Sequence, residues 1–192
     1  MRLFDDEDPK GTRSGADWEH HRKARQPYGG PAQDEVGVLA MSSFVLARSN
    51  DVAVAVRGIT AYSDGVILHV VVLFADEQKR EQLDWSLQEY SRSPGRFRLG
   101  VELPDGVRAT TGTGDAPPPE SPSVGAVLTL LSSYSSGPLR WQGDYWLWPL
   151  AGSGSMVVGC SWPDRGISES LVAIDTEALR GAAQKSGPVW EE

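Results

Sequence analysis

The sequence is poor in cysteine and in positive charge. Its 192 residues include one cysteine, and 18 lysines and arginines stand against 26 aspartates and glutamates, a net charge of −8. A single cysteine cannot form an intrachain disulfide, so packing must stabilise the fold, and a reducing cytoplasm is the natural setting. The acidic balance argues against general nucleic-acid binding, because phosphate contacts need clustered basic side chains.

Long hydrophobic runs are missing as well. The longest, over residues 70–75, is far shorter than a helix that spans a bilayer. The first eight residues, MRLFDDED, contain no apolar signal core. We therefore expect a cytoplasmic protein without a membrane segment. The 21 glycines and 13 prolines favour many turns, and hence many short strands rather than long helices.

The first 35 residues differ from the rest of the chain. They are polar and interrupted by glycine and proline, which predicts a flexible tail, residues 1–35, ahead of one domain, residues 36–192. Within this tail, four residues could form a docking segment for an acidic partner surface: Trp18, Arg22, Lys23 and Arg25. The alternative is a solvated turn.

Alternating apolar residues predict β-strands after residue 36. The alternation of residues 52–56 slips beside Gly58 and then resumes, which is the pattern of a β-bulge. Asp64-Gly65 predicts a tight hairpin turn, and taking this pair as the loop places Ala61 opposite Leu68. The strand after the turn is apolar on both faces and is expected in the middle of the structure. Its His69 is expected to be a buried, hydrogen-bonded histidine, since the sequence nominates no acid or nucleophile as its partner.

Aromatic residues are densest over residues 141–150, WQGDYWLWPL. A Gly/Ser-rich turn separates this stretch from a second apolar one, and we interpret the two as a hairpin in which Trp148 lies opposite Met156. The face expected to fill the core then contains Trp146, Trp148, Met156, Val158, Cys160 and Trp162. The other face contains Trp141 and Tyr145, which are either covered or form an exposed ligand-binding platform.

Residues suited to catalysis are few. Three carboxylates are the candidates for a hydrolase: Asp144, Asp164 and Glu169. Cys160 is expected to be an inert buried thiol, because a nucleophilic thiol needs a nearby base and His69 is the only histidine of the predicted domain. The adjacent His20 and His21 lack the spacing with which helical histidines bind one metal ion. We expect neither a metal nor a cofactor.

The predicted strands and their hairpins point to an all-β protein. The expected architecture is an antiparallel two-sheet β-sandwich of about eight or nine strands, and a partly open β-barrel is the alternative. A short C-terminal helix is expected to begin at Asp175 or Thr176, because either side chain can cap its first turn.

Three stretches carry a resemblance: residues 51–56 (DVAVAV), 146–150 (WLWPL) and 162–167 (WPDRGI). On these motifs, residues 36–190 resemble a group of uncharacterised actinobacterial proteins. The group has no known activity, so the resemblance implies no function.

Three functions are compatible with the sequence. The first is a non-catalytic interaction or assembly module that binds another protein or a second copy of itself, with the tail as a docking arm. The second is a carbohydrate- or small-ligand-binding module that uses Trp141 and Tyr145. The third is a hydrolase that uses Asp144, Asp164 or Glu169.

Overall fold

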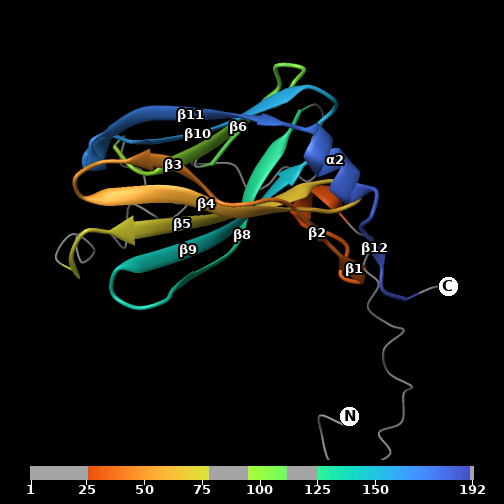
Figure 1. The fold of residues 1–192 in the computed structure, drawn as a ribbon, viewed down its shortest axis with the longest axis horizontal. Helices are drawn as coiled ribbons and strands as arrows, with labels where there is room; N and C mark the ends of the chain where they lie inside the picture. The colour runs from red at the N-terminus through yellow and green to blue at the C-terminus, as the bar shows by residue number, and fades with distance from the viewer. Residues whose placement is uncertain (1–25, 78–94, 112–124, 191–192) are drawn as a thin grey trace, which may run out of the picture.

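The computed structural model describes residues 26–77, 95–111 and 125–190. Within these ranges the chain forms two antiparallel sheets that pack face to face (Figure 1). The predicted all-β sandwich is therefore confirmed. The described strands of the sandwich belong to two separate sheets, and neither closes into a barrel.

The larger sheet has six strands in the order β2-β4-β5-β9-β8, with β3 also paired to β4. Its strands are β2 (Val38–Met41), β3 (Phe44–Arg48), β4 (Val52–Ala61), β5 (Val66–Phe74), β8 (Val127–Ser135) and β9 (Arg140–Trp148). Because β4, β5 and β9 each have a neighbour on both sides, residues from distant parts of the sequence meet across them.

The smaller sheet has four strands in the order β11-β10-β6-β7. Its strands are β6 (Arg98–Glu102), β7 (Arg108–Thr110), β10 (Ser155–Trp162) and β11 (Ile167–Asp175). The remaining elements are the two-stranded pair β1 (Glu35–Val36) and β12 (Gly187–Pro188), the 3₁₀ turns η2 (Pro27–Gly29) and η3 (Pro163–Arg165), and the helix α2 (Glu177–Ala183).

The predicted hairpin of β4 and β5 is present, together with its bulge. The register shifts between Val56 and Gly58, where the sequence alternation slips. Ala61 pairs with Val66 rather than Leu68. The Tyr62 amide donates to the Gly65 carbonyl at 2.8 Å, so the loop consists of the two residues before Gly65. The error is two residues, one full period of a strand, and the predicted faces are therefore preserved.

The predicted aromatic hairpin is wrong in its pairing. β9 lies between β5 and β8 in the larger sheet, whereas β10 lies between β6 and β11 in the smaller one. Trp148 pairs with Val127 of β8, not with Met156. Residues 149–154 carry the chain from one sheet to the other. An alternating sequence indicates which side chains share a face, but it does not distinguish a paired strand from one in the opposite sheet.

The expected core face is correct for β10 and inverted for β9. Met156, Val158, Cys160 and Trp162 are all at most 2% exposed and belong to the main core. In β9, however, the core side chains are Trp141, Tyr145 and Leu147.

Trp146 lies on the outer face of the larger sheet and is nevertheless fully buried. Its indole N–H donates to the Pro27 carbonyl at 2.9 Å, and its ring meets Tyr62 edge-on at 5.7 Å. Trp148 is half-buried, with Tyr28 of η2 edge-on beside it at 6.4 Å. Residues 27–29 of the predicted tail thus belong to the folded part of the chain, and they cover the outer side of β9.

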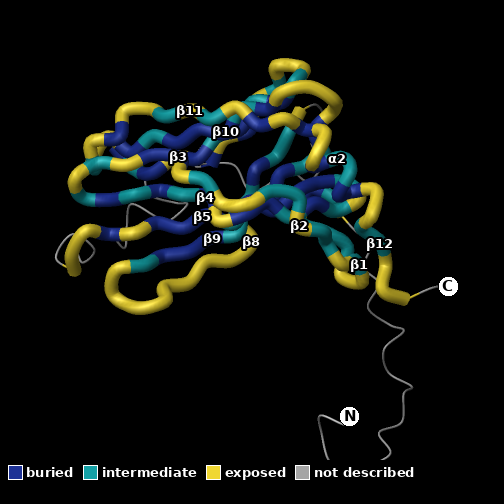
Figure 2. Tube along the Cα trace, viewed as in Figure 1, coloured by how far each residue is buried: buried dark blue, intermediate teal, exposed yellow. Residues whose placement is uncertain are grey.

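The strands β5 and β9 are consequently buried along most of their length on both faces (Figure 2). Burial of a Trp side chain removes about 150–250 Å² from water and contributes up to about 4–6 kcal/mol, an upper bound because the unfolded chain is itself compact. Trp162 buries its ring in the main core edge-on to Phe97, and Trp146 buries its ring under η2. One indole therefore fills the interior between the sheets, and the other closes part of the outer face of the larger sheet.

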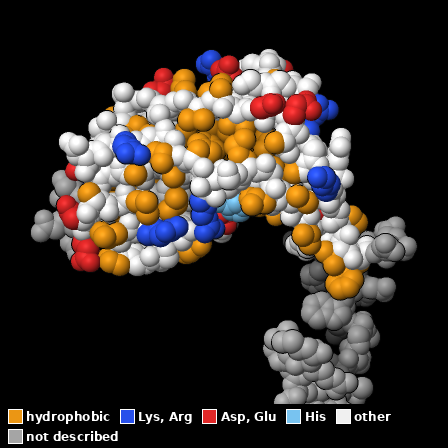
Figure 3. All heavy atoms as spheres, in the orientation of Figure 1, with side chains coloured by type: hydrophobic (Ala, Val, Ile, Leu, Met, Phe, Trp, Pro, Cys, Tyr) orange, Lys and Arg blue, Asp and Glu red, His pale blue; other side chains and the backbone are white. Residues whose placement is uncertain are grey.

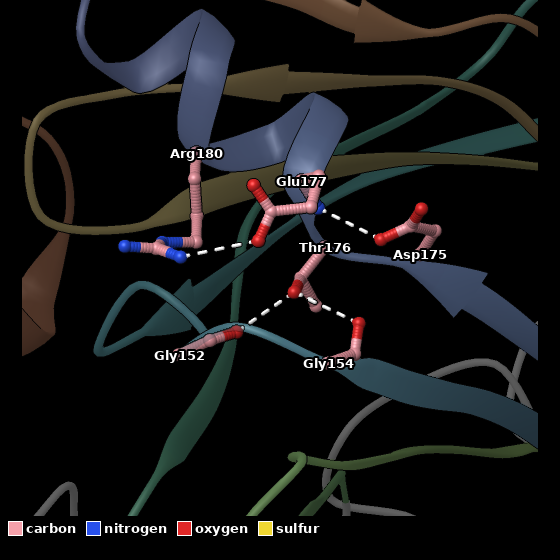
Figure 4. A network of polar contacts seen from close by, with 6 residues as sticks. All are labelled: Gly152, Gly154, Asp175, Thr176, Glu177 and Arg180. Atoms are coloured by element: carbon pink, nitrogen blue, oxygen red, sulfur yellow. Dashed lines mark hydrogen bonds and ion pairs between the residues drawn. The ribbon is translucent and has the colours of Figure 1, made fainter.

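The helix α2 contacts β2 and β4 through its buried Leu179, Ala182 and Ala183. The Asp175 carboxylate accepts the Glu177 amide at 3.0 Å and is therefore the capping group. The neighbouring Thr176 is fully buried, and its hydroxyl lies 2.7 Å from the Gly152 carbonyl and 3.0 Å from that of Gly154 (Figure 4). This hydroxyl ties the helix to the connection between the two sheets.

Substitution of Thr176 by valine should lower the free energy of unfolding by about 1 kcal/mol, because it removes the hydrogen bonds of a fully buried hydroxyl. Urea denaturation measures the change. The matched control is Thr110→Val in β7, where the side chain is exposed and the effect should stay within about 0.5 kcal/mol. Equal shifts for the two variants would contradict the role assigned to the Thr176 hydroxyl.

Candidate functional site

A row of polar side chains crosses the outer face of the larger sheet. Pairing places His69 of β5 beside Asp144 of β9, and Asp144 beside Ser132 of β8. Thr60 of β4 lies next to the imidazole. We call Thr60, His69, Asp144 and Ser132 the histidine row. It comes from four neighbouring strands, so the sheet itself holds these side chains together.

The hydrogen bonds of the row are short and continuous. His69 Nδ1 lies 2.7 Å from Asp144 Oδ1, and His69 Nε2 lies 2.8 Å from Thr60 Oγ1. The Ser132 hydroxyl donates to Asp144 Oδ2 at 3.2 Å. An ionised carboxylate only accepts, so Nδ1 carries the proton of the neutral imidazole. Nε2 then accepts, and the Thr60 hydroxyl donates to it.

The row is partly open to water. The His69 and Asp144 side chains are 23% and 31% exposed, and Thr60 is half-buried. The prediction of a hydrogen-bonded histidine is correct, but its location is not the core, because the flanking Leu68 and Val70 point inward and His69 therefore points outward. The imidazole has an acid partner that sequence reasoning missed. His69 and Asp144 are 75 positions apart in the sequence, and they meet because β5 pairs with β9.

A second acidic group, Glu35 of β1, acts on Tyr62, the residue that follows β4. Glu35 accepts hydrogen bonds from the Ser63 amide at 2.6 Å and from the Ser186 hydroxyl at 2.7 Å. Burial, and then the negative charges of Glu35 and Asp144, raise the pKa of Tyr62 above its ordinary value of 10.0. Tyr62 therefore presents a neutral hydroxyl at neutral pH, on the same face of β4 as Thr60.

The three carboxylates predicted for a hydrolase do not form one site. Asp144 lies on the outer face of the larger sheet, where it alternates with the core residue Tyr145. Glu169 is exposed on β11 and alternates with inward residues of the smaller sheet, so it lies on the opposite surface of the sandwich. Asp164 lies in η3, where its amide donates to the Gly95 carbonyl. Asp144 alone of the three has a histidine partner in the described residues.

The predicted aromatic platform is absent. Trp141 and Tyr145 are 9% and 3% exposed and pack side by side in the main core. Of the two alternatives for these rings, covered or exposed, the covered one is correct, because this side of β9 faces the smaller sheet. These two rings therefore offer no surface on which a sugar could stack.

An exposed apolar surface lies elsewhere, on the pair β1 and β12. Val36, Val189 and Trp190 are 60%, 52% and 75% exposed. We call β1, β12 and these flanking residues the apolar arm. Figure 1 shows this pair beside the end of the sandwich, and Figure 3 shows hydrophobic side chains along it. Trp18, Arg22, Lys23 and Arg25, the predicted docking residues, lie outside the described residues.

No group of three or more His, Cys, Asp or Glu side chains in the described ranges is placed to hold a metal ion. No helix in the described part of the chain has the length and apolar character that crossing a membrane requires. Comparisons with protein-family models, with curated proteins and with solved structures found no match. The resemblance to the actinobacterial group remains a prediction.

Cys160 is 2% exposed, and burial raises the pKa of its thiol to about 12. Because of this raised pKa, the fraction of Cys160 present as thiolate near pH 8 is on the order of one in ten thousand. This fraction is far smaller than that of an ordinary exposed cysteine. We expect no measurable reaction with a disulfide reagent at that pH, and one thiol per chain should react once denaturant is added. Rapid labelling of the native protein would contradict this assignment.

Proposed function

We propose that this protein is an interaction module that docks another protein through its apolar arm and its N-terminal tail. The observation that carries the proposal is the exposure of Trp190, at 75%, beside exposed Val36 and Val189. Exposed aliphatic side chains are common when scattered, but a Trp grouped with valines on a projecting element is typical of a binding surface.

The apolar arm is held in place before any partner binds. β1 and β12 pair through Glu35 with Pro188 and Val36 with Gly187, and the Val189 amide donates to the Asp34 carbonyl at 2.7 Å. The three hydrogen bonds that Glu35 accepts from Ser63 and Ser186 anchor the arm to the β4–β5 turn and to the segment after α2. Because the backbone beside Trp190 is already held, less conformational entropy is lost when the arm binds, which favours affinity.

The partner is proposed to present an apolar groove bordered by acidic side chains. The groove would accept Trp190, and the acidic border would meet Arg22, Lys23 and Arg25 of the tail. The tail is joined to the arm through a short segment, because η2 and residues 30–34 are all that separate residue 26 from β1.

A photocrosslinker in place of Trp190 tests the arm. We expect it to capture a defined protein, and Trp190→Ser should then weaken binding of that purified protein by about 30-fold, the effect of losing an aromatic anchor worth about 2 kcal/mol. Calorimetry measures the affinity. Leu171→Ser is the matched control, since Leu171 is 60% exposed on β11 of the smaller sheet. This variant should bind the partner with the same affinity as the unaltered chain.

Three results would overturn the docking proposal. Trp190→Ser could bind as tightly as the unaltered chain, or no adduct could form at position 190. Light scattering could also show a doubled mass that Trp190→Ser abolishes, which would make the occupant a second copy of this chain.

Removal of residues 1–25 tests the tail separately. The truncated chain should bind the captured partner more weakly, and the difference should shrink at high salt because charged contacts at a surface are screened. Its melting temperature should stay nearly unchanged, since the polar, glycine- and proline-interrupted composition of the tail predicts that it buries little apolar surface. Substitution of Arg22, Lys23 and Arg25 by glutamine isolates the charge contribution. Undiminished affinity in the truncated chain would remove the tail from the interface.

A further inference from the structure

The histidine row points to a chemical activity in addition to binding. We propose that Thr60, His69 and Asp144 form a nucleophile–base–acid triad that hydrolyses carboxylic esters with a small apolar group. Thr60 is the nucleophile, His69 is the general base, and Asp144 is the positioning residue that fixes the imidazole.

The proposal rests first on the continuity of the hydrogen bonds. The two bonds to the imidazole, 2.8 Å from Thr60 and 2.7 Å from Asp144, lie within the range that proton transfer and ring orientation require. The carboxylate holds the proton on Nδ1, so the lone pair on Nε2 is aimed at the Thr60 hydroxyl. A hydroxyl that donates to a neutral imidazole is in the correct state to become a nucleophile.

The second argument is the rigidity of the support. The triad residues come from β4, β5 and β9, three neighbouring strands of the larger sheet. The Ser132 hydroxyl holds the second oxygen of Asp144. Sites built on strands keep their geometry better than sites on loops, which matters because small displacements reduce the rate steeply.

The surroundings of Thr60 indicate the substrate class. Leu39 of β2 lies opposite Thr60 and is 67% exposed, and Gly58 lies opposite His69. A Cβ added at Gly58 would lie 3.1 Å from a Leu39 methyl carbon, so this apolar side chain extends over the space that the glycine leaves. A small apolar group of an ester fits beside Leu39. The neutral Tyr62 hydroxyl is the type of donor that stabilises an oxyanion.

The reaction needs only the ester and water. Thr60 Oγ1 bonds to the carbonyl carbon while its proton moves to His69 Nε2. The bond from that carbon to the alcohol oxygen then breaks, and the alcohol leaves with the proton from Nε2. Water attacks the acyl-Thr60 ester with His69 again as the base, and the Thr60 oxygen regains a proton as the acid departs.

Hydrolysis of p-nitrophenyl acetate and butyrate by the full chain tests the proposal. We expect Thr60→Val, which keeps the shape of the side chain and removes the hydroxyl, to lose about a hundredfold or more of kcat. Asp144→Asn should lower kcat with little change in KM and should alter the pH profile, because it changes the tautomer of His69. Thr129→Val is the control, since Thr129 lies in β8 opposite Trp146 and does not belong to the histidine row, and the rate of this variant should match that of the unaltered chain.

A fluorophosphonate probe provides a readout that does not depend on turnover. Mass mapping of the unaltered chain should place the adduct on Thr60, and Thr60→Val should take up none. Circular dichroism checks that each variant is folded. The proposal is overturned if the unaltered chain neither hydrolyses the esters nor takes up the probe. Equal rates for Thr60→Val and the unaltered chain would also overturn it, since the imidazole would then act without the threonine.

Discussion

The pairing of β5 with β9 is the constraint on which both proposed surfaces depend. It sets His69 beside Asp144 while Leu68, Val70 and Tyr145 face the core. If β9 slipped by one residue relative to β5, Asp144 would point inward and core side chains would be exposed. Hydrophobic burial and the hydrogen bonds of the histidine row therefore favour the same register. The same pairing places Trp146 on the outer side, where η2 has to cover it.

The outer face of the larger sheet has a covered part and a part that is open to water. Near Trp146, the N-terminal segment closes over the sheet, with Pro27 as the hydrogen-bond acceptor. Two residues earlier in β9, Asp144 and its partners stay partly open to water. The segment that covers Trp146 then continues into β1, where Glu35 fixes the apolar arm. Docking and chemistry are thereby proposed on adjoining parts of one surface, supported by one stretch of chain.

Several features of the fold could be predicted because they are local. The bulge beside Gly58, the faces of the β4–β5 hairpin and the buried side of β10 all follow from alternation within a few residues. The candidate site could be predicted only in fragments. His69 and Asp144 each stood out as polar residues in apolar strands, but nothing near either residue indicates the other. Thr60 carries no signal before its distance to the imidazole is known.

The order of residues is enough to specify which side chains share a face of each strand, where the chain turns, and that two sheets must pack together. Alternation and turn chemistry depend on residues only a few positions apart, so they can be recognised in each strand without knowledge of the rest of the chain. The assignment of β9 and β10 to different sheets, the burial of Trp141 and Tyr145, and the meeting of Thr60, His69 and Asp144 arise only when the strands are ordered side by side. The reason is physical: strand order depends on how all the apolar faces are buried together, and many orders are compatible with one alternating pattern.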